Sequence, residues 1–277
     1  MAKIMTIYIA FQRIANGSLS LEDSFLISEK AWRKGGSKTF VEVNKKVSVN
    51  DLLYGVIVQS GNDAAIAIAE GISGTEDGFA EEMNYVANSL GMKNTVFKNS
   101  TGWPDPEQYT TARDLNILAT ALIRDFPIDK YPELYPIFAE KNFSFNGIKQ
   151  GNRNPLVYGT DGADGLKTGH TVESGYGLVG SAIRDDQRII MVLNGLQSMK
   201  KRSSESRRLM DLFFREFKLY KFFDAGEPVD QANVWLGDQA KVNLVLEEPL
   251  HLVLARSDRR KMKVKVEWND PVPAPIK

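Results

Sequence analysis

The sequence predicts an α/β fold in which helices flank an antiparallel sheet, followed by a smaller unit built only of strands. Helical periodicity and capping signals recur between residues 3 and 124, whereas glycine-rich and apolar strand-like runs separated by turn residues follow over residues 162–193. Beyond Lys218 the chain changes to short alternating strands with no helix between them. We therefore predict one domain over residues 1–218 and a second, all-β domain over residues 219–277.

Composition limits the classes of function that this chain can have. Its 277 residues suffice for a large domain with a real core and a small second domain. Lys and Arg together number 35, as do Asp and Glu, so the net charge gives no reason to expect nucleic acid or an anionic membrane as a bulk partner. Cysteine is absent, two histidines cannot by themselves assemble a zinc site, and no HExxH spacing occurs. We expect no metal and no other cofactor.

The first predicted helix covers residues 3–15. Its apolar residues recur at helical spacing, and Asn16-Gly17 supplies a left-handed stop. Lys3 lies in the first turn, beside the apolar stripe rather than opposite it. An ammonium held there would be partly desolvated, which would lower its pKa toward a value useful for proton transfer. The alternative is a solvated lysine near the start of the chain.

Capping signals predict further helices in the middle of the chain. In each case a Ser or Thr stands directly before a segment with helical periodicity. The predicted caps and helices are Ser48 with residues 49–58, Thr75 with residues 76–90, and Thr111 with residues 112–124.

The stretch Gln59-Ser60-Gly61-Asn62 separates two of the predicted apolar helices, the second of which covers residues 64–70. We expect Asp63 to cap that second helix. On a tight connection between buried helices, the side chains of Ser60 and Asn62 would be aimed rather than free. The alternative is a plain interhelical turn, for which Ser, Gly and Asn are the usual residues.

Lys167-Thr168-Gly169 stands among glycines and is followed by two apolar strand-like runs that are typical of a buried antiparallel pair. A lysine and a hydroxyl on a strand, with glycine beside them, can present a cation, an O–H and open backbone N–H groups to one anionic ligand. The alternative is a strand whose end happens to carry these residues.

A last helix is predicted from Ser204 to about Phe217, with Arg202 just before it. The second domain follows and ends in a proline-rich piece at residues 271–277. It is short for a sandwich, so we expect a truncated all-β domain. Its predicted strands cover residues 234–236, 242–246, 250–254 and 262–268.

A helix that begins with a partly buried lysine, an S-x-N turn and a K-T-G strand, in this order, match the S-x-x-K, S-x-N and K-T-G motifs of penicillin-recognising serine acyl-enzymes. The chain resembles the low-molecular-weight penicillin-binding proteins, specifically the D-alanyl-D-alanine carboxypeptidases. The resemblance extends to the residues around these motifs and to Thr111-Ala112-Arg113-Asp114. It implies a penicillin-binding transpeptidase/β-lactamase-like domain followed by a C-terminal β domain.

The resemblance also implies a mechanism. A serine three places before Lys3 would attack the carbonyl of the penultimate D-alanine in a peptidoglycan stem peptide, with neutral Lys3 as proton acceptor. Ser60, together with Lys167, would relay a proton to the departing D-alanine. Asn62 would bind the substrate backbone and steady Lys3.

The substrate-binding residues follow from the same resemblance. The backbone N–H of His170 would form half of the oxyanion hole, beside Gly169. Thr168 and an arginine would hold the terminal carboxylate, because a guanidinium can pair with a carboxylate through two hydrogen bonds. Arg202 is our first choice for that arginine and Arg153 the second; a solvated surface arginine is the alternative for each.

The serine of S-x-x-K would stand immediately before Met1. We expect the native protein to have an upstream segment with an export signal, early strands and this serine, to act in the periplasm or elsewhere outside the cytoplasm, and to associate with a membrane through its terminal segments. Partners would be stem peptides that end in D-Ala-D-Ala, with β-lactams as covalent inhibitors. Two other functions stay open: a serine β-lactamase, which Ser60-Gly61-Asn62 in place of S-D-N disfavours, and a noncatalytic peptidoglycan-binding module.

Overall fold

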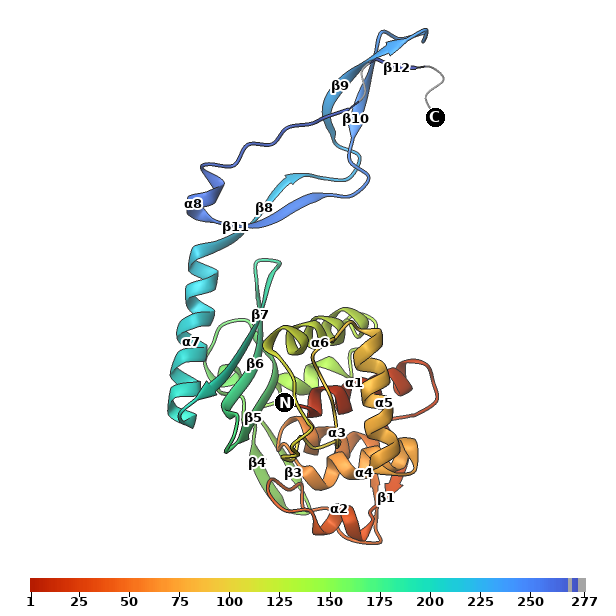
Figure 1. The fold of residues 1–277 in the computed structure, drawn as a ribbon, viewed down its shortest axis with the longest axis vertical. Coiled ribbons are helices and arrows are strands. Elements are labelled where there is room, and N and C mark those ends of the chain that lie inside the picture. Colours follow the sequence, from red (N-terminus) through yellow and green to blue (C-terminus); the bar gives the residue numbers. More distant parts are fainter. Residues whose placement is uncertain (269–270, 274–277) are drawn as a thin grey trace. The chain divides into compact units, whose positions relative to one another are not determined.

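Helices make up most of the first part of the chain in the computed structural model, as the periodicity predicts (Figure 1). Ser48, Thr75 and Thr111 each accept a hydrogen bond from the backbone N–H three residues further on, so the three predicted caps are confirmed. The helices of this part are α1 (Lys3–Ala15), α2 (Glu29–Arg33), α3 (Val49–Ile57), α4 (Asn62–Ser73), α5 (Glu76–Ser89) and α6 (Ala112–Asp125).

The start of α4 differs from the prediction. The helix begins at Asn62, and Gly61 occupies the N-cap position without a side-chain hydrogen bond. Asp63 lies in the first turn, where its carboxylate accepts hydrogen bonds of 2.8–3.3 Å from the backbone N–H groups of residues 39–41. The prediction that Asp63 caps the helix is therefore wrong, because the carboxylate is used by a loop that is remote in the sequence.

Helix α1 runs through the core of the helical part. Residues 3–11 are all buried, so the helix is covered on every side rather than along one stripe. It packs against α3, α4, α5 and α6. Each large apolar side chain that is fully buried, such as Phe11, stabilises the fold by roughly 1.5–3 kcal/mol. The position of Lys3 in the first turn is therefore set by the core itself.

A three-stranded sheet stands beside the helices, in the order β5-β6-β7, with the N-terminus next to β5 (Figure 1). The strands are β5 (Ala163–Thr171), β6 (Gly175–Arg184) and β7 (Gln187–Leu196). β5 and β6 are antiparallel, and their register pairs Lys167 with Val179 and His170 with Tyr176. The predicted sheet flanked by helices is confirmed, and K-T-G lies on its edge strand β5.

Helix α7 (Met199–Glu216) begins earlier than the sequence predicts. The side chain of Ser198 accepts a hydrogen bond of 3.1 Å from the N–H of Lys201, and its carbonyl accepts one of 2.9 Å from the N–H of Arg202. Ser198 therefore caps the helix, and Arg202 lies within its first turns rather than before it. The prediction overlooked this serine as a cap.

Smaller elements connect these parts. β1 (Ser24–Leu26) pairs with β2 (Lys46–Ser48), and β3 (Asn142–Phe145) forms a hairpin with β4 (Ile148–Gly151). Two short 3-10 helices, η1 (Tyr135–Ala139) and η2 (Pro155–Tyr158), occupy the proline- and aromatic-rich segment before β5.

The structure describes residues 1–268 and 271–273, in two compact units. One unit contains residues 1–184 and 188–210, and the other contains residues 185–187 and the chain from residue 211 onward. The domain boundary after residue 218 stays a prediction from the sequence. None of the helices in the described part of the chain is long and apolar enough to cross a membrane.

Strands dominate the second unit, as predicted. β8 (Phe217–Phe223) pairs with β11 (Leu250–Ala255), and β9 (Pro228–Trp235) lies between β10 (Lys241–Val245) and β12 (Val272–Pro273). Two predictions are wrong. Residues 262–268 alternate in polarity, but they form no strand, because a strand also needs a neighbouring strand that pairs with it. The short helix α8 (Arg256–Arg259) follows β11, where the sequence predicted no helix. Of the predicted proline-rich end, residues 274–277 lie outside the described residues, as do residues 269–270 of the second domain.

Candidate active site

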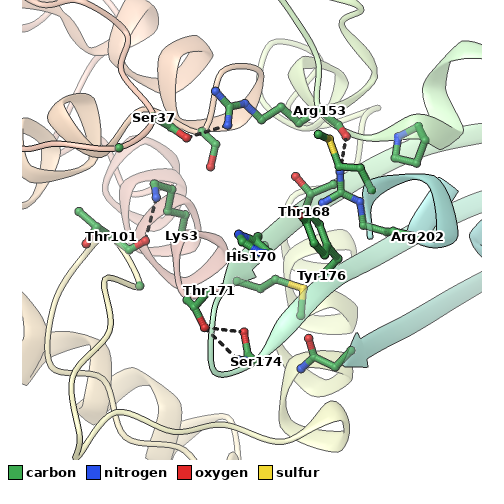
Figure 2. A pocket seen from close by; sticks show the side chains of 18 of the residues that line it. Lys3, Ser37, Thr101, Arg153, Thr168, His170, Thr171, Ser174, Tyr176 and Arg202 are labelled. Atoms are coloured by element: carbon green, nitrogen blue, oxygen red, sulfur yellow. Dashed lines mark hydrogen bonds between the residues drawn. The ribbon is translucent and has the colours of Figure 1, made fainter. Parts of the chain in front are cut away.

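The predicted site residues lie around a cleft with a volume of about 1170 Å³ (Figure 2). All of them line it except Lys167, which is buried behind its wall with 2% of its surface exposed. The residues that line it are Lys3, Ser60, Asn62, Arg153, Thr168, Gly169, His170 and Arg202. Residues from the start of α1, the α3–α4 connection, β5 and α7 thus meet around one space.

The amine of Lys3 is buried and held by two acceptors. Its Nζ donates to the side-chain oxygen of Asn62 at 2.6 Å. It also donates to the backbone carbonyl of Thr101 at 2.7 Å (Figure 2). Burial, followed by the nearby charge of Arg153, lowers the pKa of Lys3 from its ordinary 10.5 to about 7. A neutral amine has two N–H groups and one lone pair. With both N–H groups donated, the lone pair is left to accept a proton.

Asn62 is itself fixed by the loop that follows α2. Its side-chain Nδ2 donates to the carbonyl of Gly35 at 2.8 Å, and its backbone N–H donates to the carbonyl of Ser37 at 2.7 Å. Gly36 lies between them with φ of +79°, and a Cβ there would come within 2.8 Å of the Asn62 amide nitrogen. The orientation of the Asn62 carbonyl toward Lys3 therefore depends on a glycine at position 36.

Ser60 lies on the tight connection between α3 and α4. It is half-buried, lines the cleft and has φ of +61°, in the left-handed region that non-glycine residues seldom occupy. Such a conformation costs about 1–3 kcal/mol and persists where the surrounding structure enforces it. The backbone of the S-x-N turn is therefore strained at Ser60, and this conformation sets the direction of the Ser60 hydroxyl.

Thr168 and Gly169 of the K-T-G strand line the cleft, and Lys167 is buried behind them. Burial, followed by the charge of Lys3, holds the pKa of Lys167 well below its ordinary range, and its Nζ lies 3.4 Å from the carbonyl of Thr168. A Cβ at Gly169 would come within 2.8 Å of the Met1 side chain and 3.1 Å of the Met1 nitrogen. Glycine at position 169 therefore lets the start of α1 approach β5 closely.

Met1 consequently lies inside the cleft. It lines the cleft together with Lys3. The Met1 nitrogen lies against Gly169 of the K-T-G strand.

Arg153 is projected into the cleft by its two asparagine neighbours. The side chain of Asn152 donates to the carbonyls of Phe138 and Glu140 and accepts from the N–H of Asn154. These hydrogen bonds fix the turn that carries Arg153. The guanidinium of Arg153 donates to the Ser37 hydroxyl at 2.7 Å (Figure 2).

Arg202 is more deeply buried, with 6% of its surface exposed, and burial lowers the pKa of its guanidinium. Its Nη2 lies 3.5 Å from the carbonyl of Arg153, at the limit of a hydrogen bond, and its Nε has no hydrogen-bond partner. Among the described residues it forms no ion pair. A buried guanidinium with unused donors beside an open cleft is suited to bind a carboxylate ligand.

Several cleft residues escaped the sequence reasoning. Thr101 contributes a backbone carbonyl, for which no side-chain pattern exists, and Ser37 holds Arg153 across a large sequence separation. Trp103 also lines the cleft, with the ammonium of Lys34 4.2 Å from its ring centroid. Tyr176 could have been found by pairing the K-T-G strand with the strand after it, because it stands opposite His170.

The model of the D-alanyl-D-alanine carboxypeptidase family matches residues 1–197. This chain belongs to that family. A second model, that of the penicillin-binding protein 5 C-terminal domain, matches residues 217–277, so the predicted family and the all-β C-terminal domain are both confirmed.

Individual members of the carboxypeptidase family agree along the chain. D-alanyl-D-alanine carboxypeptidase DacA of Haemophilus influenzae is 39% identical over 98% of this chain and 69% of that protein. The crystal structure of penicillin-binding protein 5 from the same organism has a TM-score of 0.86 at 39% identity, covering 99% of this chain and 80% of that one. Penicillin-binding protein D2 of Listeria monocytogenes, in its ampicillin-bound form, has a TM-score of 0.67 at 28% identity over 77% of this chain and 85% of that one.

Proposed function

We propose that this chain provides the machinery of a serine-type D-Ala-D-Ala carboxypeptidase, which removes the terminal D-alanine from peptidoglycan pentapeptides through an acyl-enzyme and is acylated by β-lactams. The observation that carries the proposal is the buried Lys3 amine, with a pKa of about 7 and both N–H groups donated, beside the S-x-N turn and the K-T-G strand. The ampicillin-bound Listeria relative supports β-lactams as ligands of this site.

Acylation requires the serine of S-x-x-K at the position before Met1. Its hydroxyl oxygen forms a bond to the carbonyl carbon of the penultimate D-alanine while neutral Lys3 takes its proton. The backbone N–H of His170 and that of the serine stabilise the oxyanion. The peptide C–N bond then breaks, and the departing D-alanine receives a proton through Ser60 and Lys167.

Deacylation reverses this proton path. Water adds to the ester carbonyl, the bond to the serine oxygen breaks, and the proton returns to that oxygen, which releases the shortened peptide. Arg202 and Thr168 bind the carboxylate of the terminal D-alanine. Arg153 is the weaker candidate because its guanidinium already donates to Ser37, whereas Arg202 retains an unused donor.

The substrate fixes where the protein would act. Peptidoglycan lies outside the cytoplasm, so we place the protein in the periplasm or an equivalent compartment, in association with the membrane.

The test uses a form of the protein in which a serine precedes Met1. Fluorescent penicillin should label it covalently, and D-alanine should be released from an N-acyl-D-Ala-D-Ala peptide, with the acid limb of the acylation rate near pH 7. Lys3→Met should abolish labelling, whereas Lys93→Met, at an exposed position, should not. Absence of both labelling and D-alanine release would show a noncatalytic binding module instead. Rapid turnover of the bound penicillin would show a β-lactamase.

A further inference from the structure

Tyr176 has no part in the chemistry described above, yet its ring contacts the side chains of two residues that have, His170 and Arg202. The ring centroids of Tyr176 and His170 are 3.9 Å apart with an interplanar angle of 34°. The guanidinium carbon of Arg202 lies 5.8 Å from the Tyr176 ring centroid, within the range of a cation–π interaction. In Figure 2 the Tyr176 side chain lies between those of His170 and Arg202.

The fold makes this arrangement through strand register. Tyr176 of β6 is directly opposite His170 of β5, and cross-strand partners present their side chains on the same face of a sheet. That face is the one that lines the cleft, to which both residues contribute. Arg202 reaches the ring from α7, so three elements bring the three side chains together.

Arg202 has few other contacts that would orient it. Among the described residues, the only hydrogen bond of its side chain is the long one to the carbonyl of Arg153, and its Nε is unpartnered. A free arginine side chain loses about 2 kcal/mol of rotamer entropy when it is fixed. A ring that restricts the guanidinium before the ligand arrives removes part of that loss from binding.

We propose that Tyr176 is a positioning residue that selects ligands with a free C-terminal carboxylate, by holding the Arg202 guanidinium in the orientation that binds this group. The inference rests on the proposed function, since that function supplies the carboxylate. The aromatic ring, rather than the hydroxyl, carries the effect. The ligand class is therefore an acyl-D-alanyl-D-alanine peptide with a free carboxylate, in preference to its C-terminal amide.

The test measures noncovalent binding to the chain itself, which needs no nucleophile. NMR titrations give Kd for an N-acyl-D-Ala-D-Ala peptide and for its C-terminal carboxamide. Wild type and Tyr176→Phe should prefer the carboxylate to the same degree. Tyr176→Leu should reduce this preference by about tenfold while leaving the Kd of the amide unchanged. Tyr85→Leu, an exposed tyrosine on α5 outside the cleft, is the matched control.

Each possible result of the titrations supports or overturns the role of Tyr176. Tyr176→Leu with an intact preference overturns the inference and leaves the proposed function standing. Equal weakening of both ligands also overturns it, because that result indicates a merely structural role. If the wild type binds both ligands with equal affinity, the cleft has no specific site for the carboxylate, and both proposals are overturned. If Tyr176→Leu does not fold, Tyr176→Thr, which suits a strand, serves in the same titrations.

Discussion

Replacing Lys3 by methionine should change how the stability of the protein depends on pH. Methionine retains most of the side-chain length but removes the titrating amine. In the folded protein, mainly because of burial, the pKa of Lys3 is about 7 instead of 10.5. Between these two values the unfolded chain binds more protons than the folded one, so the Lys3 contribution makes wild-type stability rise with pH.

The magnitude follows from the same two pKa values. At about 1.4 kcal/mol per pH unit, the lowered pKa corresponds to a penalty of roughly 5 kcal/mol, fully present below pH 7 and absent above pH 10.5. The methionine variant lacks this titration. From about pH 7.5 to about pH 9.5, the unfolding free energy of wild type minus that of Lys3→Met should therefore increase by roughly 2 kcal/mol.

Urea unfolding at a series of pH values measures this difference directly. Lys93→Met provides the control, since an exposed lysine should leave the two stability curves parallel. The absolute difference at one pH also contains the loss of the donors to Asn62 and Thr101, so the slope is the diagnostic quantity. Parallel curves for wild type and Lys3→Met would refute a buried amine with a strongly lowered pKa.

Three further perturbations test other parts of the site and its support. Asp63→Asn removes the carboxylate whose charge raises the pKa of Lys3, so the acid limb of penicillin acylation in the serine-bearing form should move to lower pH, by up to about one unit. Ser60→Gly should stabilise the chain by about 1 kcal/mol in urea unfolding, whereas Ser60→Ala should not, because only glycine tolerates φ of +61° without strain. Gly162→Ala would place a Cβ 2.0 Å from a backbone carbonyl oxygen at φ of +69°, and should cost more than about 2 kcal/mol of unfolding free energy. Gly35→Ala, whose Cβ would make only an ordinary contact at 3.9 Å, should change stability by less than about 1 kcal/mol.

The sequence predicted those parts of the protein that local chemistry determines. A serine or threonine before a periodic segment identifies a helix start from a few neighbouring residues, and the caps at Ser48, Thr75 and Thr111 therefore appear in the structure as expected. The sequence placed Lys3 in the first turn beside the apolar stripe, which left both a partly desolvated and a solvated amine open, and the structure shows that the side chain is buried.

Contacts between remote segments could not be predicted. Asp63 stood where a helix cap is expected, but three backbone N–H groups of a loop more than twenty residues away compete for its carboxylate. The carbonyl of Thr101 that holds Lys3 belongs to the peptide backbone, which every residue shares. Such contacts depend on how the chain returns to itself, and residue type alone does not encode them.

The cationic side chains that converge on the cleft have a consequence for folding as well as for chemistry. Lys3, Arg153 and Arg202 each lower the pKa of Lys167, and among the described residues none of these four cationic groups forms an ion pair. Where Lys3 and Lys167 are protonated, the mutual repulsion of these groups opposes the compact state. An anion bound in the cleft supplies a counter-charge and stabilises the native chain by an amount that grows with the logarithm of one plus the ratio of its free concentration to its Kd. The fraction of the protein that is folded therefore depends on the concentration of this ligand.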